Sequence, residues 1–102
     1  MWKETTINVG TLVEKDKVKV AFKYEGKCVP YDLVMQPSCG CTDVKWNSQT
    51  SEINAVLRAG NIPRHLEQNS IAIRKSIKVT YLCDGTQYID RLYITGTLVK
   101  KV

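Results

Sequence analysis

The length and composition of this chain are those of a single globular domain. Its 102 residues are 43% hydrophobic and 25% charged, which excludes a disordered segment and allows roughly 65% of the unfolded chain's surface to be buried. No apolar run approaches the roughly 18 residues that span a bilayer as a helix, so no membrane partner is expected. The net charge of +5 is dispersed along the chain and lacks an aromatic platform, which argues against a nucleic-acid partner.

The pattern of the first half predicts short strands separated by turns. Residues 18–24 alternate apolar side chains with lysines, which is typical of a strand with one buried face. A turn is expected at residues 25–27. Three further strands are predicted over Asp32–Gln36, Val44–Trp46 and Ile53–Leu57.

The second half predicts one long β-hairpin. Apolar residues keep one parity over Ile71–Cys83, and Asp84-Gly85 then marks a tight turn. The return strand runs over about Tyr88–Val99 and carries apolar residues on both faces, so we expect both of its faces to be covered. Gly96 within this strand indicates a bulge or a close approach of another backbone.

Together these strands predict the fold class. About seven short strands with turn signals between them are typical of an all-β antiparallel β-sandwich. We expect one domain over residues 1–102, in which residues 1–10 form an N-terminal arm able to exchange a strand with a partner. Residues 59–70 break the pattern because they are polar and turn-rich, and a loop with one helical turn after Pro63 is predicted there.

The most specific feature is the run Ser38-Cys39-Gly40-Cys41-Thr42, which follows the apolar run Leu33–Pro37. Together with two weaker segments, Ile73–Val79 and Leu92–Leu98, it resembles a bacterial immunoglobulin-like domain family of unknown function that carries a Ser-Cys-Gly-Cys-Thr signature. That family is akin to the ASPM/SPD-2/Hydin and major-sperm-protein type β-sandwiches. The resemblance covers about Val18–Val99 and implies an immunoglobulin-like sandwich. Most members of the family are exported and carry leaders, and no leader is predicted here.

The four cysteines, Cys28, Cys39, Cys41 and Cys83, allow three interpretations. The favoured one is small buried thiols, because free cysteine is commonly buried and Cys83 lies on the apolar face of its strand. The second is a disulfide of Cys83 with Cys28 or Cys39, since Cys39 and Cys41 are too splayed to pair in a regular strand. The third is a four-sulfur zinc site, although structural zinc uses paired Cys-x2-Cys knuckles. We therefore expect no metal and no cofactor.

No arrangement of residues predicts catalysis. His65 is the single histidine, and it belongs to a polar loop in which a solvated side chain is expected. The chain has no phosphate-binding glycine loop and no Ser-His-Asp arrangement, so we expect a protein that is not an enzyme.

Binding is the function that these observations favour. The candidate partner contacts are Trp2 at the N-terminus and the loop residues Ile62, Arg64, His65 and Leu66. By analogy of fold and domain arrangement, the chain is predicted to be a structural or interaction protein. It would dock in multiple copies, as an accessory or decoration component, on protein subunits of a large assembly such as a bacteriophage capsid or tail.

The alternative is a bacterial accessory binding module of the periplasm or cell surface. Residues 1–6 lack a basic segment followed by an apolar core, so no signal peptide is predicted and a virion or cytoplasmic location is expected. Oxidised cysteines would favour the alternative, whereas four free thiols would favour the decoration component.

Overall fold

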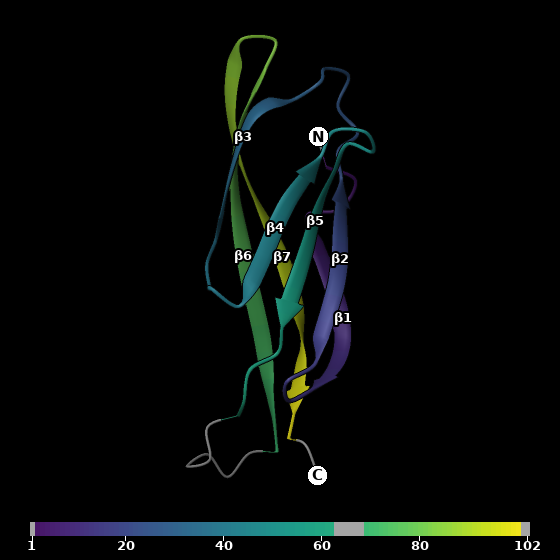
Figure 1. Ribbon diagram of the computed structural model, residues 1–102, viewed down its shortest axis with the longest axis vertical. Helices are drawn as coiled ribbons and strands as arrows, with labels where there is room; N and C mark the ends of the chain where they lie inside the picture. The colour runs from purple at the N-terminus through teal and green to yellow at the C-terminus, as the bar shows by residue number, and fades with distance from the viewer. Residues whose placement is uncertain (1, 63–68, 101–102) are drawn as a thin grey trace.

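Two β-sheets pack face to face in the computed structural model, which describes residues 2–62 and 69–100 (Figure 1). One sheet has the strand order β1 (Thr6–Val13), β7 (Thr86–Val99), β6 (Ser70–Cys83), β3 (Tyr31–Pro37). The other has the order β2 (Lys17–Lys23), β5 (Glu52–Arg58), β4 (Thr42–Asn47). The molecule measures 51 × 20 × 16 Å, and the described residues contain no helix. The predicted all-β sandwich of about seven strands is confirmed.

The strand order is that of an immunoglobulin-like sandwich. The β2–β5–β4 sheet faces β3, β6 and β7. Adjacent strands within the β2–β5–β4 sheet and within the β7–β6–β3 set are antiparallel, as in immunoglobulin domains. Strand β1 differs, because it runs parallel to β7. Residues 6–10, which were predicted as part of an N-terminal arm, therefore belong to a sheet instead. Ahead of them, Trp2 forms an isolated bridge with Tyr24.

The core lies between the sheets because inward-facing apolar residues alternate with outward-facing polar ones along each strand. The parity predicted for β6 is confirmed: its buried residues are Ile77, Val79, Tyr81 and Cys83. The expectation that both faces of β7 are covered is wrong at Ile89, whose side chain is 55% exposed. Only the inner face of this sheet packs on another sheet, so apolar residues of the opposite parity reach solvent.

Glycine is required where β1 pairs with β7. The register shifts between Asn8 and Thr11, and Gly10 has a positive φ of 74° at this bulge. A Cβ on Gly96 would lie 2.8 Å from the Gly10 carbonyl oxygen and 2.9 Å from Val9 Cγ2. The close backbone approach predicted for Gly96 is confirmed.

Replacing Gly96 should therefore destabilise the fold. Gly96→Ala forces the β1 backbone away from β7 and is expected to lower the free energy of unfolding by about 1–3 kcal/mol. Gly60→Ala is the matched control, because a Cβ there meets nothing within 4 Å. Urea unfolding of both variants measures the difference, and equal midpoints would contradict the close approach.

Candidate functional site

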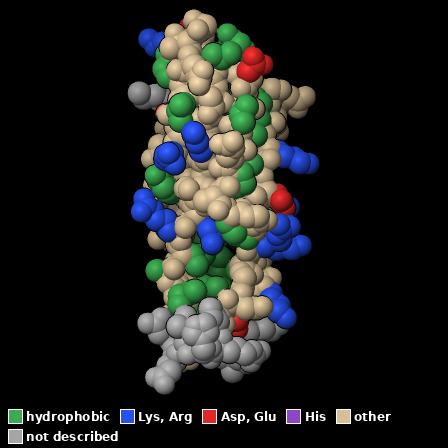
Figure 2. Space-filling model, turned by 90° about the vertical axis from the view of Figure 1, so that its left-hand side faces the viewer, with side chains coloured by type: hydrophobic (Ala, Val, Ile, Leu, Met, Phe, Trp, Pro, Cys, Tyr) green, Lys and Arg blue, Asp and Glu red, His purple; other side chains and the backbone are tan. Residues whose placement is uncertain are grey.

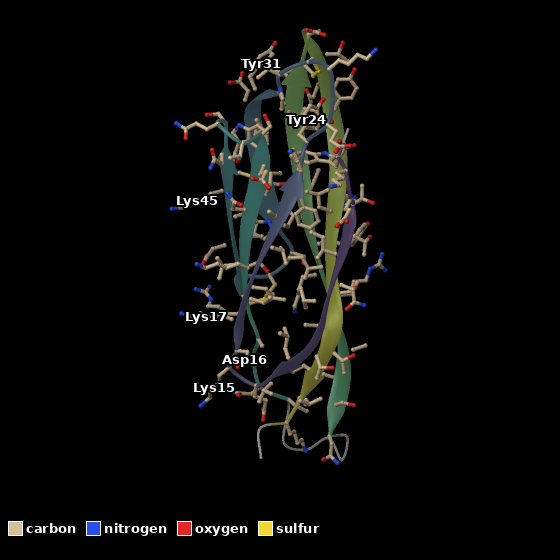
Figure 3. The ribbon with its side chains drawn as sticks, turned by 90° about the vertical axis from the view of Figure 1, so that its right-hand side faces the viewer. Lys15, Asp16, Lys17, Tyr24, Tyr31 and Lys45 are labelled. Atoms are coloured by element: carbon tan, nitrogen blue, oxygen red, sulfur yellow. A yellow bond between two sulfur atoms is a disulfide. The ribbon has the colours of Figure 1, made fainter. Side chains whose placement is uncertain are left out.

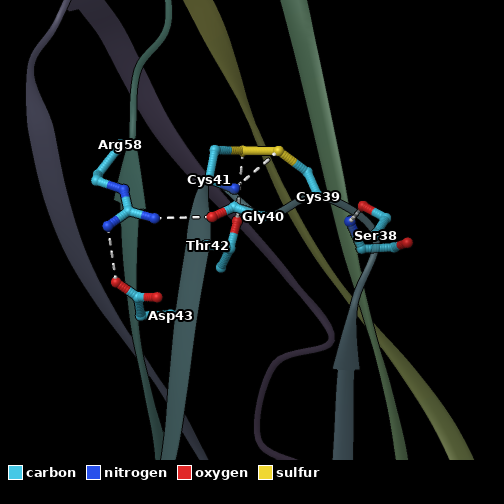
Figure 4. The surroundings of a disulfide bond; sticks show 8 residues. Ser38, Cys39, Gly40, Cys41, Thr42, Asp43 and Arg58 are labelled. Carbon is cyan, nitrogen blue, oxygen red and sulfur yellow. Dashed lines mark hydrogen bonds and ion pairs between the residues drawn. A yellow bond between two sulfur atoms is a disulfide. The ribbon is translucent and has the colours of Figure 1, made fainter.

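The Ser-Cys-Gly-Cys-Thr run connects the two sheets by joining β3 to β4 (Figure 4). The Ser38 N–H donates to the Ser76 carbonyl at 2.8 Å, and Ser38 Oγ accepts from the Ser76 N–H at 3.0 Å. This exchange extends the β3–β6 ladder by one residue beyond Pro37. At the other end Thr42 is buried and begins β4. The motif is thus a structured crossing between sheets.

Cys39 and Cys41 form a disulfide across this crossing, with their Cα atoms 5.2 Å apart. The expectation that these two residues are too splayed to pair is wrong, because the chain turns at Gly40 instead of continuing as a strand. Arg58 holds the turn: its Nη2 donates to the Gly40 carbonyl at 2.7 Å, and its backbone N–H donates to the Cys41 carbonyl at 2.8 Å. The same guanidinium pairs with Asp43 at 3.2 Å.

Cys28 and Cys83 form the second disulfide, with a Cα–Cα distance of 5.9 Å. It ties the connection between β2 and β3 to the end of β6, and the Tyr24 hydroxyl lies 3.4 Å from each sulfur. The favoured expectation of four free thiols is therefore wrong, since all four cysteines lie in the described residues and none is free.

A four-sulfur zinc site is not formed either. The two disulfides lie at opposite ends of β3, so the four sulfurs do not converge on one point. Among the described residues, no group of three or more potential ligands from histidine, cysteine, aspartate and glutamate is placed to hold a metal ion.

The two disulfides differ in what they contribute to stability. Cys28 and Cys83 are 55 positions apart in sequence, and closing a loop of that length is worth about 4 kcal/mol when only the entropy of the unfolded chain is counted. Cys39 and Cys41 are 2 positions apart, and the same treatment gives less than about 2 kcal/mol. The Cys39–Cys41 disulfide therefore contributes little to holding the fold.

An aromatic cluster of Trp2, Tyr24, Trp46, Tyr81 and Tyr88 lies toward the end of the sandwich at which the Asp84-Gly85 turn joins β6 to β7. We name this the hairpin end. Trp2 makes edge contacts with Tyr24, Trp46 and Tyr81 at centroid distances of 5.2, 6.3 and 6.1 Å. Tyr81 also stacks on Tyr88 at 5.5 Å. Trp2 was a candidate partner contact, but its side chain is only 8% exposed, so it packs on its own domain.

Asp90 organises the polar side of this cluster. Its Oδ2 accepts hydrogen bonds from Trp2 Nε1 at 3.0 Å and from the Tyr81 hydroxyl at 2.6 Å. Burial raises the pKa of Tyr81 well above its ordinary value, and the hydrogen bond to Asp90 raises it further. Burial also raises the pKa of Tyr24. Both phenols are thus held neutral within the fold.

Exposed apolar side chains gather on the outer face of the four-stranded sheet, close to the same end. We name Tyr31, Val34 and Ile89 the outer apolar patch, with exposed fractions of 45, 54 and 55%. Val34 and Ile89 flank Thr80 across three adjacent strands, β3, β6 and β7. Figure 3 shows Tyr31 at the same end of the molecule as Tyr24.

Sequence reasoning missed this patch, although a signal was present. Val34 has the opposite parity to the half-buried residues of β3, and Ile89 to the buried residues of β7. An apolar residue on the solvent face of a strand is such a signal.

Of the remaining candidate contacts, Ile62 alone belongs to the part of the chain that the structure describes. Ile62 is buried, with an exposed fraction of 2%, and its backbone N–H donates to Glu14 Oε2 at 2.9 Å. Arg64, His65 and Leu66 lie outside the described residues, as does the helical turn predicted after Pro63.

A cleft of about 230 Å³ opens beside the Cys39–Cys41 disulfide. Both cysteines line it, as do apolar side chains of β5, β6 and β7 and the cationic side chains Arg58 and Lys75. Figure 2 shows hydrophobic side chains in a recess near the lower end of the molecule. This Cys39–Cys41 cleft is separate from the outer apolar patch.

Comparison with known proteins adds no identity. No protein-family model matches the chain, and no curated protein is significantly similar to it. The resemblance to the immunoglobulin-like family with the Ser-Cys-Gly-Cys-Thr signature therefore stays a prediction. The described residues also include no helix long and apolar enough to cross a membrane.

The buried phenols predict a loss of stability at alkaline pH. The folded protein holds Tyr81 and Tyr24 neutral, whereas the unfolded chain ionises tyrosine near about pH 10, so stability is lost as the pH rises above that value. Tyr81→Phe should lower the free energy of unfolding by about 1–2 kcal/mol at neutral pH and reduce the alkaline loss. Urea unfolding at neutral pH and at about pH 11 measures both effects. The exposed variant Tyr31→Phe is the control, and an equal alkaline loss in both variants would contradict this account.

The two disulfides should differ in their effect on stability. The pair of substitutions Cys28→Ala and Cys83→Ala is expected to cost about 4 kcal/mol, and the pair Cys39→Ala and Cys41→Ala less than about 2 kcal/mol. Thermal unfolding of the two double variants provides the comparison. A larger loss for the Cys39 and Cys41 variant would show that the crossing between the sheets depends on its disulfide.

Proposed function

We propose that this protein is a non-enzymatic binding module that docks on a protein partner through the outer apolar patch. The observation that carries the proposal is the patch itself, in which apolar side chains from neighbouring strands remain exposed around Val34 and Ile89. Contiguous exposed apolar side chains on a soluble domain mark interaction sites. In contrast, the buried Tyr81 hydroxyl and the half-buried Asp90 carboxylate are hydrogen-bonded to each other.

The charges near the patch define the partner further. Lys78 on β6 and Arg91 on β7 are cross-strand neighbours, two residues along their strands from Thr80 and Ile89. They therefore lie on the same face of the sheet as Ile89. Arg74 lies farther along that face, with its guanidinium 4.5 Å from the centroid of the Tyr93 ring. Together with the net charge of +5, these side chains favour a partner with an apolar contact surface and an acidic rim.

The disulfides support the periplasmic or cell-surface setting over a reducing one. Disulfides persist in oxidising compartments and are rare where glutathione and thioredoxin keep thiols reduced. Both cysteine pairs are bonded here. The accessory binding module is thus the better-supported form of the proposal.

A decoration component of a bacteriophage particle is the second candidate. The elongated shape of 51 × 20 × 16 Å, with the patch toward one end, suits a small protein that attaches to a larger surface. Disulfides also persist on virion surfaces. The two candidates differ in what sediments with the protein, namely a particle or a single partner.

Sedimentation of the native lysate in high salt tests the proposal. Val34→Glu places a carboxylate in the patch and should weaken the association by at least about tenfold, so the protein should move as a free 11.6 kDa chain. Val13→Glu is the matched control, since Val13 is an exposed strand valine on β1. Equal co-sedimentation of both variants would show that the contact surface is not the outer apolar patch.

A further inference from the structure

The Cys39–Cys41 disulfide has surroundings that a purely structural bond does not need. We propose that it is a redox-active disulfide that exchanges with an anionic thiol bound in the Cys39–Cys41 cleft. This inference does not depend on the outer apolar patch, which belongs to a different part of the surface. It rests on the position of the bond, on the groups around its sulfurs and on the contrast with the Cys28–Cys83 disulfide.

The position of the bond gives a small thiol access to it. Cys39 and Cys41 are both half-buried, and both line the cleft of about 230 Å³. Leu57, Ile71 and Ile73 contribute an apolar wall, and Lys75 and Arg58 contribute positive charge. Lys75 has the parity of the buried residues of β6, so it lies on the side of the sheet that faces the cleft. An incoming thiol that carries carboxylates matches this combination.

The hydrogen bonds around the sulfurs distinguish the two halves of the disulfide. The Cys41 backbone N–H donates to Cys39 Sγ at 3.1 Å, whereas the Thr42 hydroxyl lies farther from Cys41 Sγ, at 3.9 Å. A donor at the shorter distance stabilises negative charge on sulfur, as do nearby cations. Cys39 is therefore the better leaving thiolate, and Cys41 Sγ is the atom that an incoming thiolate attacks.

The exchange balances with a glutathione-class thiol as the co-reactant. The incoming thiolate forms a bond to Cys41 Sγ, the Cys39–Cys41 bond breaks, and its electron pair remains on Cys39 as a thiolate. A second thiolate attacks the sulfur of the first bound thiol, which releases the small-molecule disulfide and leaves a thiolate on Cys41. Two thiols are thereby oxidised, the protein disulfide is reduced by two electrons, and the reverse sequence re-forms it.

The Cys28–Cys83 disulfide provides an internal control. Cys83 is 2% exposed and Cys28 is half-buried, and the Tyr24 hydroxyl lies 3.4 Å from both sulfurs. It also closes a long loop, whereas the Cys39–Cys41 bond spans a single intervening residue. Because a thiolate must reach a sulfur to attack it, glutathione should reduce Cys39–Cys41 before the more covered Cys28–Cys83 bond.

Acid-quenched alkylation of the folded protein in glutathione buffers, read by mass spectrometry at each cysteine, tests the redox activity. The expected result is that Cys39 and Cys41 become reduced while Cys28 and Cys83 remain bonded, and that any trapped glutathione is attached to Cys41. Reduction of both pairs at the same glutathione ratio would overturn the proposal. Glutathione trapped on Cys39 would overturn the assignment of the leaving thiolate.

Charge reversal in the cleft tests the recognition of an anionic thiol. In Lys75→Glu, the rate of reduction by glutathione relative to that by uncharged 2-mercaptoethanol should fall about tenfold. Lys19→Glu is the matched control, because Lys19 is an exposed lysine of β2 that does not line the cleft. Taking the ratio of the two thiols within each variant removes any general change in folding. An unchanged ratio in Lys75→Glu would overturn recognition by the cleft.

Discussion

The covalent link between Cys28 and Cys83 is the constraint on which the hairpin end of this molecule depends. The connection that contains Cys28 runs between the two sheets and has no regular strand of its own. Bonding it to the last residue of β6 fixes where β3 begins, and therefore where Tyr31 is displayed. It also positions the Tyr24 hydroxyl beside both sulfurs. The outer apolar patch is thus presented by a covalently anchored segment.

The aromatic cluster anchors the N-terminus at the same end. Asp90 accepts hydrogen bonds from Trp2 and from Tyr81. Trp2 is 88 positions away from Asp90 in the sequence, and Tyr81 is 9 positions away. A carboxylate with two donors is a stronger local restraint than apolar contact alone, so the segment ahead of β1 packs against the hairpin. The Cys39–Cys41 bond contributes less to the fold, and this leaves it available for thiol exchange.

The sequence predicts the sandwich well because the alternation of apolar and polar side chains along a strand is a local pattern, which can be recognised without knowing which distant residues are in contact. The parity of Ile71–Cys83 and the glycine at position 96 both predicted features that the structure contains. Cys28–Cys83 was one of the pairings that the sequence left open. The Cys39–Cys41 pairing could not be predicted, because it depends on the turn at Gly40 between strands of different sheets. The burial of Trp2 likewise depends on Asp90, which is 88 positions away. The exposed parity of Val34 and Ile89 was visible in the sequence, and its meaning became clear only when their strands were placed side by side.

The account of this protein as a binding module of an oxidising environment depends on the state of its cysteines in the source. The most direct measurement is to quench native material in acid, alkylate its free thiols and determine the modification of each cysteine by mass spectrometry. The account predicts that Cys28 and Cys83 are unmodified until the sample is reduced. Alkylation of all four cysteines before reduction would contradict it and would indicate that the protein resides in a reducing compartment.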